Sequence, residues 1–287
     1  MRAVLGGCLC VLWSTLLTAP GQAQEDCTAR NVLGVSRSIE IDTTGGPWFG
    51  EPRGDPDFLA PGEVVLTFDD GPSPRATRSI LAALAAQCTK ATFFVLGQMA
   101  TAHPDIVREI GAQGHTIGTH TWSHPNLQQL SYESAKAQIE SAFTAVERAA
   151  GRPIAPFFRY PYLSHAPAAV AYLRTRNIAQ FAVDIDSLDW LRHDAQSVIR
   201  TVMARVEHRG KGIILLHDIH PSTASAIPTI LASLKAKGFK IVHLRPKTAV
   251  ATLVAYQTPP RVHPRAPHSG RVVQAESWLR NWKWPEW

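Results

Sequence analysis

The chain of 287 residues has little cysteine, and it lacks long apolar runs beyond its first two dozen residues. Four cysteines are too few for the disulfide-rich scaffold of a small secreted domain. A membrane-spanning helix needs about 18 or more apolar residues in succession, so none is expected after the N-terminal segment. These absences, together with 45% hydrophobic residues, predict a soluble globular protein large enough for one sizeable core or two small ones.

The sequence also lacks a basic domain, although its net charge is +6. Residues 245–287 hold seven basic and two acidic residues, and Arg2 carries one further charge, which leaves residues 24–244 close to neutral. A nucleic-acid-binding domain requires a basic stripe or patch on folded structure. The charge distribution therefore predicts no nucleic-acid partner.

Residues 1–23 have the pattern of a signal peptide. A basic residue precedes the apolar stretch AVLGGCLCVLWSTLLTAP, and Gly21 and Ala23 occupy the small-residue positions of a cleavage site. We expect cleavage after Ala23 and export, to the periplasm or as a secreted protein; the alternative is an uncleaved N-terminal anchor. In an exported chain, Cys27 and Cys88 either form one disulfide or leave Cys88 as an unpaired core residue.

Strand-like and helix-like segments alternate from residue 62 to residue 244. This alternation predicts a parallel sheet covered by helices, either an open doubly wound sheet or a closed barrel. The expected strands are residues 64–68, 91–97, 115–120, 157–161, 180–186, 212–217 and 239–244. The expected helices are residues 76–87, 101–112, 132–150, 167–177, 195–208 and 224–237.

Two segments of different composition flank this region. Residues 24–61 are rich in glycine and proline and are expected to form an arm packed on the core domain. Residues 246–287 form a basic tail rich in proline and tryptophan, a composition typical of a disordered segment. Its tryptophans are also suited to stacking on sugar rings or to contact with a membrane surface.

Polar side chains follow five of the expected strands at the point where those strands end. Parallel α/β folds place their active sites at this edge, because the carboxyl ends of all strands open onto one face. The residues at these positions are Asp69, Asp70, His120, Arg159, Asp184, Asp186 and His217. Four further histidines are expected near the same edge as structural or substrate-facing residues: His115, His165, His193 and His220.

His120 and His124 are four residues apart, a spacing that places two imidazoles on one face of a helical turn, where they can share a divalent ion. Asp70 would supply a third ligand from another strand end. Two histidines and one carboxylate leave positions open to water and substrate, which is typical of a catalytic metal site. Asp69, beside Asp70, would then stay free as a base. The alternative interpretation of these two carboxylates and the following Gly-Pro is a simple turn.

Five motifs occur in the order and with the spacing of a known family: TFDDGPS, HTWSH, RYPY, DIDSLDW and ILLHD. In these motifs residues 62–245 resemble the polysaccharide deacetylases, carbohydrate esterase family four, which includes chitin, chitooligosaccharide and peptidoglycan deacetylases. The resemblance implies an α/β fold, a distorted (β/α) barrel with about seven strand–helix units. It also implies a metal-dependent hydrolase that removes N-acetyl groups from N-acetylglucosamine units of an extracytoplasmic polysaccharide or oligosaccharide.

The resemblance implies which residues move protons. Asp69 would be the general base, Arg159 would hold its carboxylate, and His217 would be the general acid, oriented by Asp186. We expect the Arg159 charge to keep the pKa of Asp69 low, so that the base is ionised at working pH. An imidazole beside a carboxylate is protonated near neutrality, which suits His217 to protonate the departing amine.

The resemblance also implies residues that bind the metal and the substrate. The metal, usually zinc and sometimes cobalt or another divalent ion, would be held by Asp70, His120 and His124. The backbone N–H of Tyr162 would help to stabilise the oxyanion. Trp190 and Leu215 would line the small apolar pocket for the acetyl methyl group.

The third motif departs from the family's pattern R-P-P-Y-G, because Tyr160 and Leu163 stand where proline and glycine are usual. Leucine at the glycine position is expected to reshape the loop or to narrow the cleft. Two alternative functions use the same fold: an O-acetyl esterase acting on an acetylated glycan, and a carbohydrate-binding protein without turnover. The second would be expected to lack the base, a ligand or the acid, all of which are present here. The sequence leaves the oligomeric state open.

Overall fold

The computed structural model describes residue 27 and residues 31–54 and 58–256. The predicted signal peptide and the C-terminal tail beyond residue 256 lie outside the described residues. Val32–Tyr256 belongs to one compact unit, and all elements below lie in it. Cys27 and Cys88 are both disulfide-bonded, so Cys88 is not an unpaired core thiol. Among the described residues, no helix combines the length and the apolarity needed to cross a membrane.

One sheet organises the described chain, and every strand pairing in it is parallel. Its main path runs β1-β10-β3-β4-β5-β6-β7-β2, and β9 joins β3 to β8. Hydrogen bonds do not close a ring among the described strands, since β2 and β8 do not pair. The strands are β1 (Arg37–Ile41), β2 (Trp48–Phe49), β3 (Glu63–Asp69), β4 (Thr92–Val95), β5 (Thr116–Thr119), β6 (Phe157–Arg159), β7 (Ala179–Phe181), β8 (Ile185–Asp186), β9 (Gly212–His217) and β10 (Lys240–Pro246).

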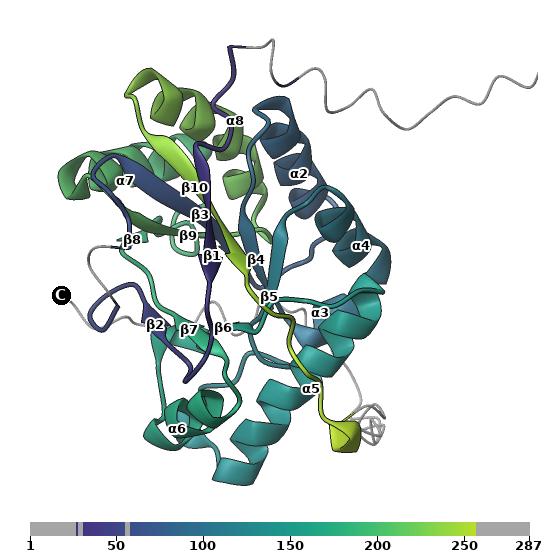
Figure 1. Ribbon diagram of the computed structural model, residues 1–287. Coiled ribbons are helices and arrows are strands. Elements are labelled where there is room, and N and C mark those ends of the chain that lie inside the picture. Colours follow the sequence, from purple (N-terminus) through teal and green to yellow (C-terminus); the bar gives the residue numbers. More distant parts are fainter. Residues whose placement is uncertain (1–26, 28–30, 55–57, 257–287) are drawn as a thin grey trace, which may run out of the picture. The chain divides into compact units, whose positions relative to one another are not determined.

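Helices connect the strands and cover the outside of the sheet (Figure 1). The predicted helix at 101–112 is two helices, because Pro104 lacks an N–H to continue one helix and instead begins the next. The last predicted helix likewise begins earlier than expected, with Pro221 in its first turn. The helices are α2 (Ala76–Ala86), α3 (Gly97–Ala102), α4 (Pro104–Ala112), α5 (Tyr132–Ala150), α6 (Pro167–Thr175), α7 (Ala195–Arg209) and α8 (Pro221–Ala236), with short 3-10 turns η1 (Leu127–Gln129), η2 (Pro161–Leu163) and η3 (Val254–Tyr256).

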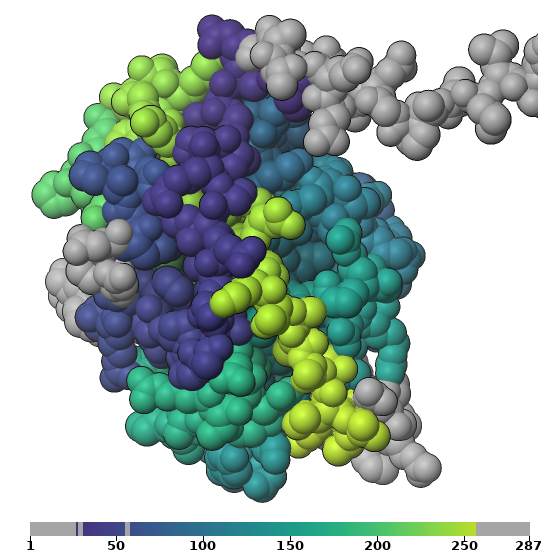
Figure 2. Space-filling view, viewed as in Figure 1, coloured from purple at the N-terminus to yellow at the C-terminus, as the bar shows by residue number. Residues whose placement is uncertain are grey.

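The segment before residue 62 contributes two strands that the sequence analysis did not predict. β1 pairs with β10 over five residue pairs, from Arg37 opposite Val242 onward, and the two run side by side in purple and yellow-green across the face in Figures 1 and 2. Arg37 fixes this strand through two hydrogen bonds of 2.7 Å to the Glu63 carboxylate. Further along, β2 pairs with β7, and the Trp48 ring stacks on Tyr160 at 5.9 Å. The two strands extend the sheet at both ends of its path.

The alternation of side chains along β3 explains how apolar core residues are followed by polar residues at the end of the strand. Val64, Leu66 and Phe68 belong to the apolar cluster that includes the buried faces of the helices. Val65 belongs instead to a second cluster, with Phe94, Phe157, Phe181 and Ile213 from neighbouring strands. Successive side chains on a strand point to opposite faces, so residues 67 and 69 follow Val65 on this inner face. The inner face therefore changes from apolar to polar toward the carboxyl ends of the strands.

A buried carboxylate ties α5 to α6 and to the chain end of the described unit. Glu140 has no exposed surface and accepts hydrogen bonds from the Tyr172 hydroxyl at 2.7 Å and from Arg176 Nε at 2.8 Å. Arg176 also donates to the Ala251 carbonyl at 2.7 Å. Removing one partner of a buried pair leaves the other charge desolvated and uncompensated.

We therefore expect Glu140→Gln to lower the free energy of unfolding by about 3 kcal/mol, measured by urea denaturation. The matched control is Glu207→Gln, because Glu207 pairs with Lys237 at 3.0 Å while both side chains are 45% exposed. Solvent screens such a pair, and its loss should cost less than about 0.5 kcal/mol. Equal losses in the two variants would contradict the assignment of a structural role to Glu140.

Candidate functional site

Asp69 and Arg159 form a fully buried ion pair at the carboxyl end of β3. Arg159 Nη1 lies 2.7 Å from Asp69 Oδ1 and also donates to Thr67 Oγ1 at 2.7 Å, while Nη2 donates to the Ala182 carbonyl at 3.2 Å. Its guanidinium carbon lies 4.3 Å from the centre of the Phe94 ring. The Arg159 side chain has no exposed surface, and that of Asp69 is 3% exposed. These contacts fix one oxygen of the Asp69 carboxylate in position.

The pKa of Asp69 differs in direction from our expectation. Burial raises it, and this effect outweighs the lowering by the Arg159 and His217 charges, so the pKa is about 6. The expectation was wrong because it counted the charge of the arginine without the cost of desolvating the carboxylate. A carboxyl group that titrates near neutrality suits a general base.

Asp70, His120 and His124 bring their ligand atoms together within 4.8 Å of one another. Asp70 Oδ1 lies 3.5 Å from His120 Nε2 and 3.4 Å from His124 Nε2. The two histidines do not lie on a helical turn as expected. Thr121 and His124 have φ angles of 73° and 60°, so the backbone reverses direction sharply between them. The His124 N–H donates to Thr121 Oγ1 at 3.0 Å. The residues meet through a tight loop after β5.

The chemistry of this cluster fits a divalent cation. His120 Nδ1 donates to the Arg159 carbonyl at 2.8 Å, which leaves the lone pair of Nε2 directed at the cluster. Burial lowers the pKa of His120 to about 3 and also lowers that of His124, so both rings are neutral. Burial raises the pKa of Asp70, but its electrostatic interactions with the surrounding histidines, which include the protonated His217, outweigh burial and lower the pKa. Asp70 Oδ1 is buried and accepts no hydrogen bond from a described residue, although carboxylate oxygens rarely lack a partner.

His217 faces this cluster from the end of β9, with its ring held by an acidic residue. Its Nδ1 lies 2.7 Å from Asp189 Oδ1, while Asp189 Oδ2 accepts the His217 backbone N–H at 2.8 Å and the Thr223 hydroxyl at 2.7 Å. Burial lowers the pKa of His217, but the Asp189 charge and hydrogen bond outweigh it and raise the pKa to about 10. The imidazole is therefore protonated at neutral pH.

The prediction that Asp186 orients His217 was wrong, and the residue in contact is Asp189. Asp186 Oδ1 instead accepts the backbone N–H of Leu188 at 2.9 Å. Leu188 has a φ of 53°, and this turn brings Asp189 under the His217 ring. The motif contains three acids, and spacing alone did not indicate which one the turn would direct inward.

Asp184 also lies away from the predicted edge. Its Oδ2 accepts the N–H of Ile213 at the beginning of β9, at 2.8 Å, and Oδ1 accepts the N–H of Glu51. Asp184 therefore sits at the amino end of β9, whereas His217 ends the same strand. The predicted strand at 180–186 is correspondingly split into β7 and β8.

The remaining predicted site residues lie on the elements around this centre. The Tyr162 ring contacts the His124 ring edge-on, with centroids 4.5 Å apart. Tyr162 and Leu163 have φ angles of 59° and 52°, so the leucine at the family's glycine position adopts the left-handed backbone that glycine favours. Leu215 is buried on β9 two residues before His217, on the same face, and Trp190 follows Asp189.

Asp218 is a further buried acid that the sequence analysis did not single out. Its Oδ2 accepts the Thr77 hydroxyl at 2.6 Å, and a Cβ at Gly71 would collide with the same carboxylate. The glycine after the two site carboxylates is therefore required for close packing against Asp218. The motif ILLHD could have indicated this residue, because its aspartate directly follows His217, the predicted general acid.

Comparisons with known proteins agree with this arrangement. A model of the family described as polysaccharide deacetylase matches residues 59–180. The chain is 31% identical over 192 residues to a chitooligosaccharide deacetylase of Azorhizobium caulinodans, which is 62% of this chain and 90% of that protein. It is 35% identical over 179 residues to a peptidoglycan-N-acetylglucosamine deacetylase of Listeria monocytogenes, covering 62% of this chain and 37% of that protein.

A solved structure shares the fold. The peptidoglycan deacetylase of Bdellovibrio bacteriovorus superposes with a TM-score of 0.69 at 31% identity, covering 79% of this chain and 67% of that one. The predicted α/β fold, a distorted barrel of parallel strands and helices, is confirmed. The identity to the Azorhizobium protein extends over nearly all of its length, and it shows that this chain belongs to the polysaccharide deacetylase family.

Proposed function

We propose that the protein is a metal-dependent hydrolase that removes N-acetyl groups from N-acetylglucosamine units of an extracytoplasmic glycan. One observation carries the proposal: a base, three metal-ligating atoms and a protonated acid converge at the carboxyl ends of β3, β5 and β9. Amide hydrolysis requires these three groups, to deprotonate water, to stabilise the tetrahedral oxyanion and to protonate the departing amine.

Asp70, His120 and His124 would hold the cation, with zinc the expected ion and cobalt or another divalent ion an alternative. Two histidines and a carboxylate are a ligand set suited to a catalytic zinc ion. A cation bound there would supply Lewis-acid polarisation of the acetyl carbonyl and would favour ionisation of water.

Asp69 acts as the base. Arg159 binds Oδ1, and Oδ2, which lies 4.0 Å from His120 Nε2, is directed at the metal-ligating cluster. This oxygen is placed to accept a proton from the attacking water. The arginine also prevents rotation of the carboxylate, because Thr67 and the Ala182 carbonyl hold the guanidinium in turn.

His217 acts as the acid. Asp189 accepts a hydrogen bond from Nδ1, so the proton available for transfer is on Nε2. The ring would donate this proton to the amine nitrogen as the C–N bond breaks. The backbone N–H of Tyr162 would donate to the oxyanion, and Leu215 and Trp190 would line the space for the acetyl methyl group.

The names of the relatives support the substrate class, and the signal-peptide pattern of residues 1–23 supports the location. The similar proteins carry the names chitooligosaccharide deacetylase and peptidoglycan-N-acetylglucosamine deacetylase. We infer an N-acetylated oligosaccharide or polysaccharide of this kind as substrate, and an exported protein, secreted or periplasmic. The runner-up is an O-acetyl esterase, because the same groups would cleave an ester. We place the catalytic domain at residues 62–245.

Acetate release tests the proposal directly. With zinc, the protein should release acetate from N-acetylglucosamine oligomers, and chelation should abolish release. Asp69→Asn should lower kcat by on the order of 10²-fold or more, since a positioned general base contributes 10²–10⁴-fold.

The matched control for this substitution is Glu207→Gln, a surface carboxylate on α7 that should retain full activity. Acetylated xylan, assayed in parallel, separates the ester from the amide. Release from xylan alone would overturn N-deacetylation, and activity that persists after Asp69→Asn would overturn the role of the base.

The pH profile tests the assignment of Asp189 rather than Asp186. Without the Asp189 charge, only the more weakly acting Asp70 and Asp69 charges oppose the effect of burial on His217, so its pKa falls and the acid loses its proton at a lower pH. Asp189→Asn should therefore move the alkaline limb of kcat/KM to lower pH by at least one unit. It should also reduce the rate at pH 7 by tenfold or more, because Nδ1 loses the charged partner that orients the ring.

Asp186→Asn keeps the acceptor oxygen for the Leu188 N–H and is the comparison variant. Its effect on the rate should be at least tenfold smaller, with an unmoved alkaline limb. A larger shift in Asp186→Asn than in Asp189→Asn would restore the original assignment from the sequence.

A further inference from the structure

A cavity lies at the end of the sheet opposite the candidate active site. Lys90 precedes β4, His115 precedes β5 and Arg152 precedes β6, whereas His120 and the other metal-ligating residues follow their strands. His115 and His120 are five residues apart along β5, or about 16 Å at the rise of an extended strand. The cavity has a volume of about 460 Å³ and is closed on one side by β10. His115 was expected at the active-site edge, and it lies at the other end.

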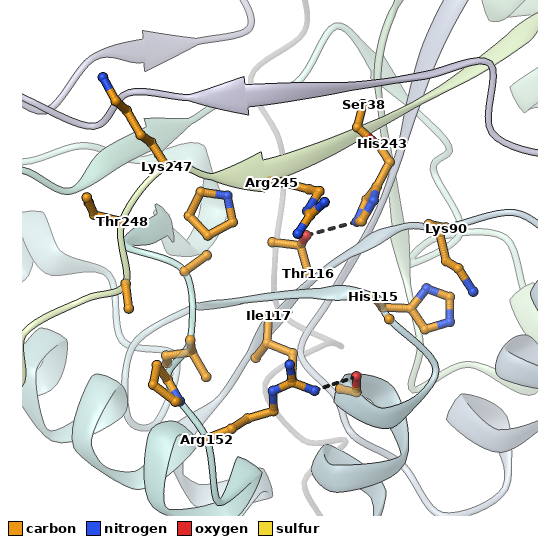
Figure 3. A pocket seen from close by; sticks show the side chains of 17 residues that line it. Ser38, Lys90, His115, Thr116, Ile117, Arg152, His243, Arg245, Lys247 and Thr248 are labelled. Atoms are coloured by element: carbon orange, nitrogen blue, oxygen red, sulfur yellow. Dashed lines mark hydrogen bonds between the residues drawn. The ribbon is translucent and has the colours of Figure 1, made fainter. Parts of the chain in front are cut away.

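Positively charged side chains dominate this cavity. Figure 3 shows His243 and Arg245 projecting from β10 on one side and Arg152 on the other, with Lys90 beside His115. None of the described residues that line it is aspartate or glutamate. Lys247, at the rim, pairs with Asp42 at 3.0 Å.

Three of these cations have no acidic partner. Within residues 31–54 and 58–256, no ion pair involves Lys90, Arg152 or Arg245. Lys90 Nζ donates to the Gln113 carbonyl at 2.7 Å and Arg152 Nη1 to the Gly111 carbonyl at 3.0 Å. These bonds fix the side chains and leave further N–H donors on each. The charges of Lys90 and Arg152 are therefore held in place, Arg245 adds an exposed charge, and no described acid pairs with any of the three.

His115 adds a buried donor without an acceptor. Its Nδ1 accepts the Ala91 N–H at 3.2 Å, and burial together with the Lys90 charge lowers its pKa to about 3, so the ring is neutral. A neutral ring that accepts at Nδ1 carries its proton on Nε2. Nε2 is buried and has no hydrogen-bond partner, and the residue is only 7% exposed. An unpaired buried N–H is costly unless a ligand accepts from it.

We propose that this cavity binds a small anion through a phosphoryl group, with Lys90, Arg152 and Arg245 supplying charge and His115 Nε2–H supplying a directed hydrogen bond. Arginine and lysine side chains suit phosphate oxygens. The volume lies in the range of sites for small organic ligands, about 300–1,000 Å³, so either free phosphate or a phosphate monoester fits. The inference does not depend on the deacetylase proposal.

Isothermal titration calorimetry at constant ionic strength tests this inference. Inorganic phosphate and glucose 6-phosphate are titrated separately into the purified protein, with chloride as the control anion. We expect saturable binding of at least one phosphoryl compound at one site. The compound that binds more tightly identifies whether the phosphoryl group comes from free phosphate or from a phosphate monoester. In wild-type protein, bound phosphate should also move the His115 ring resonances in nitrogen–proton NMR spectra.

Arg245→Gln should weaken this binding tenfold or more, because it removes one of three uncompensated cations. Lys90→Gln, on a separate strand connection, is the second variant and should act in the same direction. The matched control is Arg200→Gln, an exposed arginine on α7 that donates to Ser197 and should change the Kd less than twofold.

Two results would overturn the inference. One is the absence of saturable binding by either compound. The other is binding that Arg245→Gln and Lys90→Gln leave unchanged. If such binding also disappears on chelation, the anion sits at the metal-ligating cluster instead.

Discussion

The buried ion pair between Asp69 and Arg159 is the interaction on which the rest of the site depends. Two charges removed from water are tolerated only when they are paired and when their remaining hydrogen-bonding capacity is met. Arg159 pairs with Asp69 and also donates to the Thr67 hydroxyl and the Ala182 carbonyl, while its buried Nε has no hydrogen-bond partner among the described residues. Its own carbonyl accepts from His120, so the same residue fixes the proposed base Asp69 through its side chain and the ring of a proposed metal ligand through its backbone. A displacement of β6 would therefore disturb both groups at once.

Because side chains alternate between the two faces of a strand, a single strand supplies several groups of this site. On β3, the inner face carries Val65, Thr67 and Asp69 in turn, so one strand contributes the apolar floor, the acceptor for the arginine and the base. Asp70 departs from the alternation because its φ of 75° turns the chain away from the strand. That break places two neighbouring carboxylates in different environments. Asp69 is held by an arginine, whereas Asp70 lies beside two neutral imidazoles, where a bound cation would offset the repulsion between the two carboxylates.

Much of the architecture could be predicted from the sequence, because strand and helix periodicity is a local property. The proximity of Asp70, His120 and His124, with Asp69 beside them, could be predicted from the motifs and from the position of strand ends. The features that escaped prediction depend on single backbone torsions or on pairings distant in sequence. Leu188 in a left-handed conformation decides that Asp189 contacts His217. β1 forms a strand only because β10, about 200 residues later, offers it an edge. Asp184 was misplaced for the same reason, since its partner is the amino end of β9.

The two ends of the sheet pose opposite electrostatic problems. At the carboxyl ends, Asp70 presents an oxygen without a hydrogen-bond donor among neutral imidazoles, a setting that a cation would satisfy. At the amino ends, Lys90, Arg245 and the buried His115 line one cavity, and no aspartate or glutamate is among the described residues that line it, a setting that an anion would satisfy. A ligand that binds only the folded chain stabilises it by RT ln(1 + [L]/Kd). Because β5 joins both sites and is paired on each side, each ligand would stabilise the same sheet without contact between them. Each unsatisfied buried group destabilises the folded chain while its site is empty. A ligand that binds there would satisfy the group and raise the free energy of unfolding of the whole sheet.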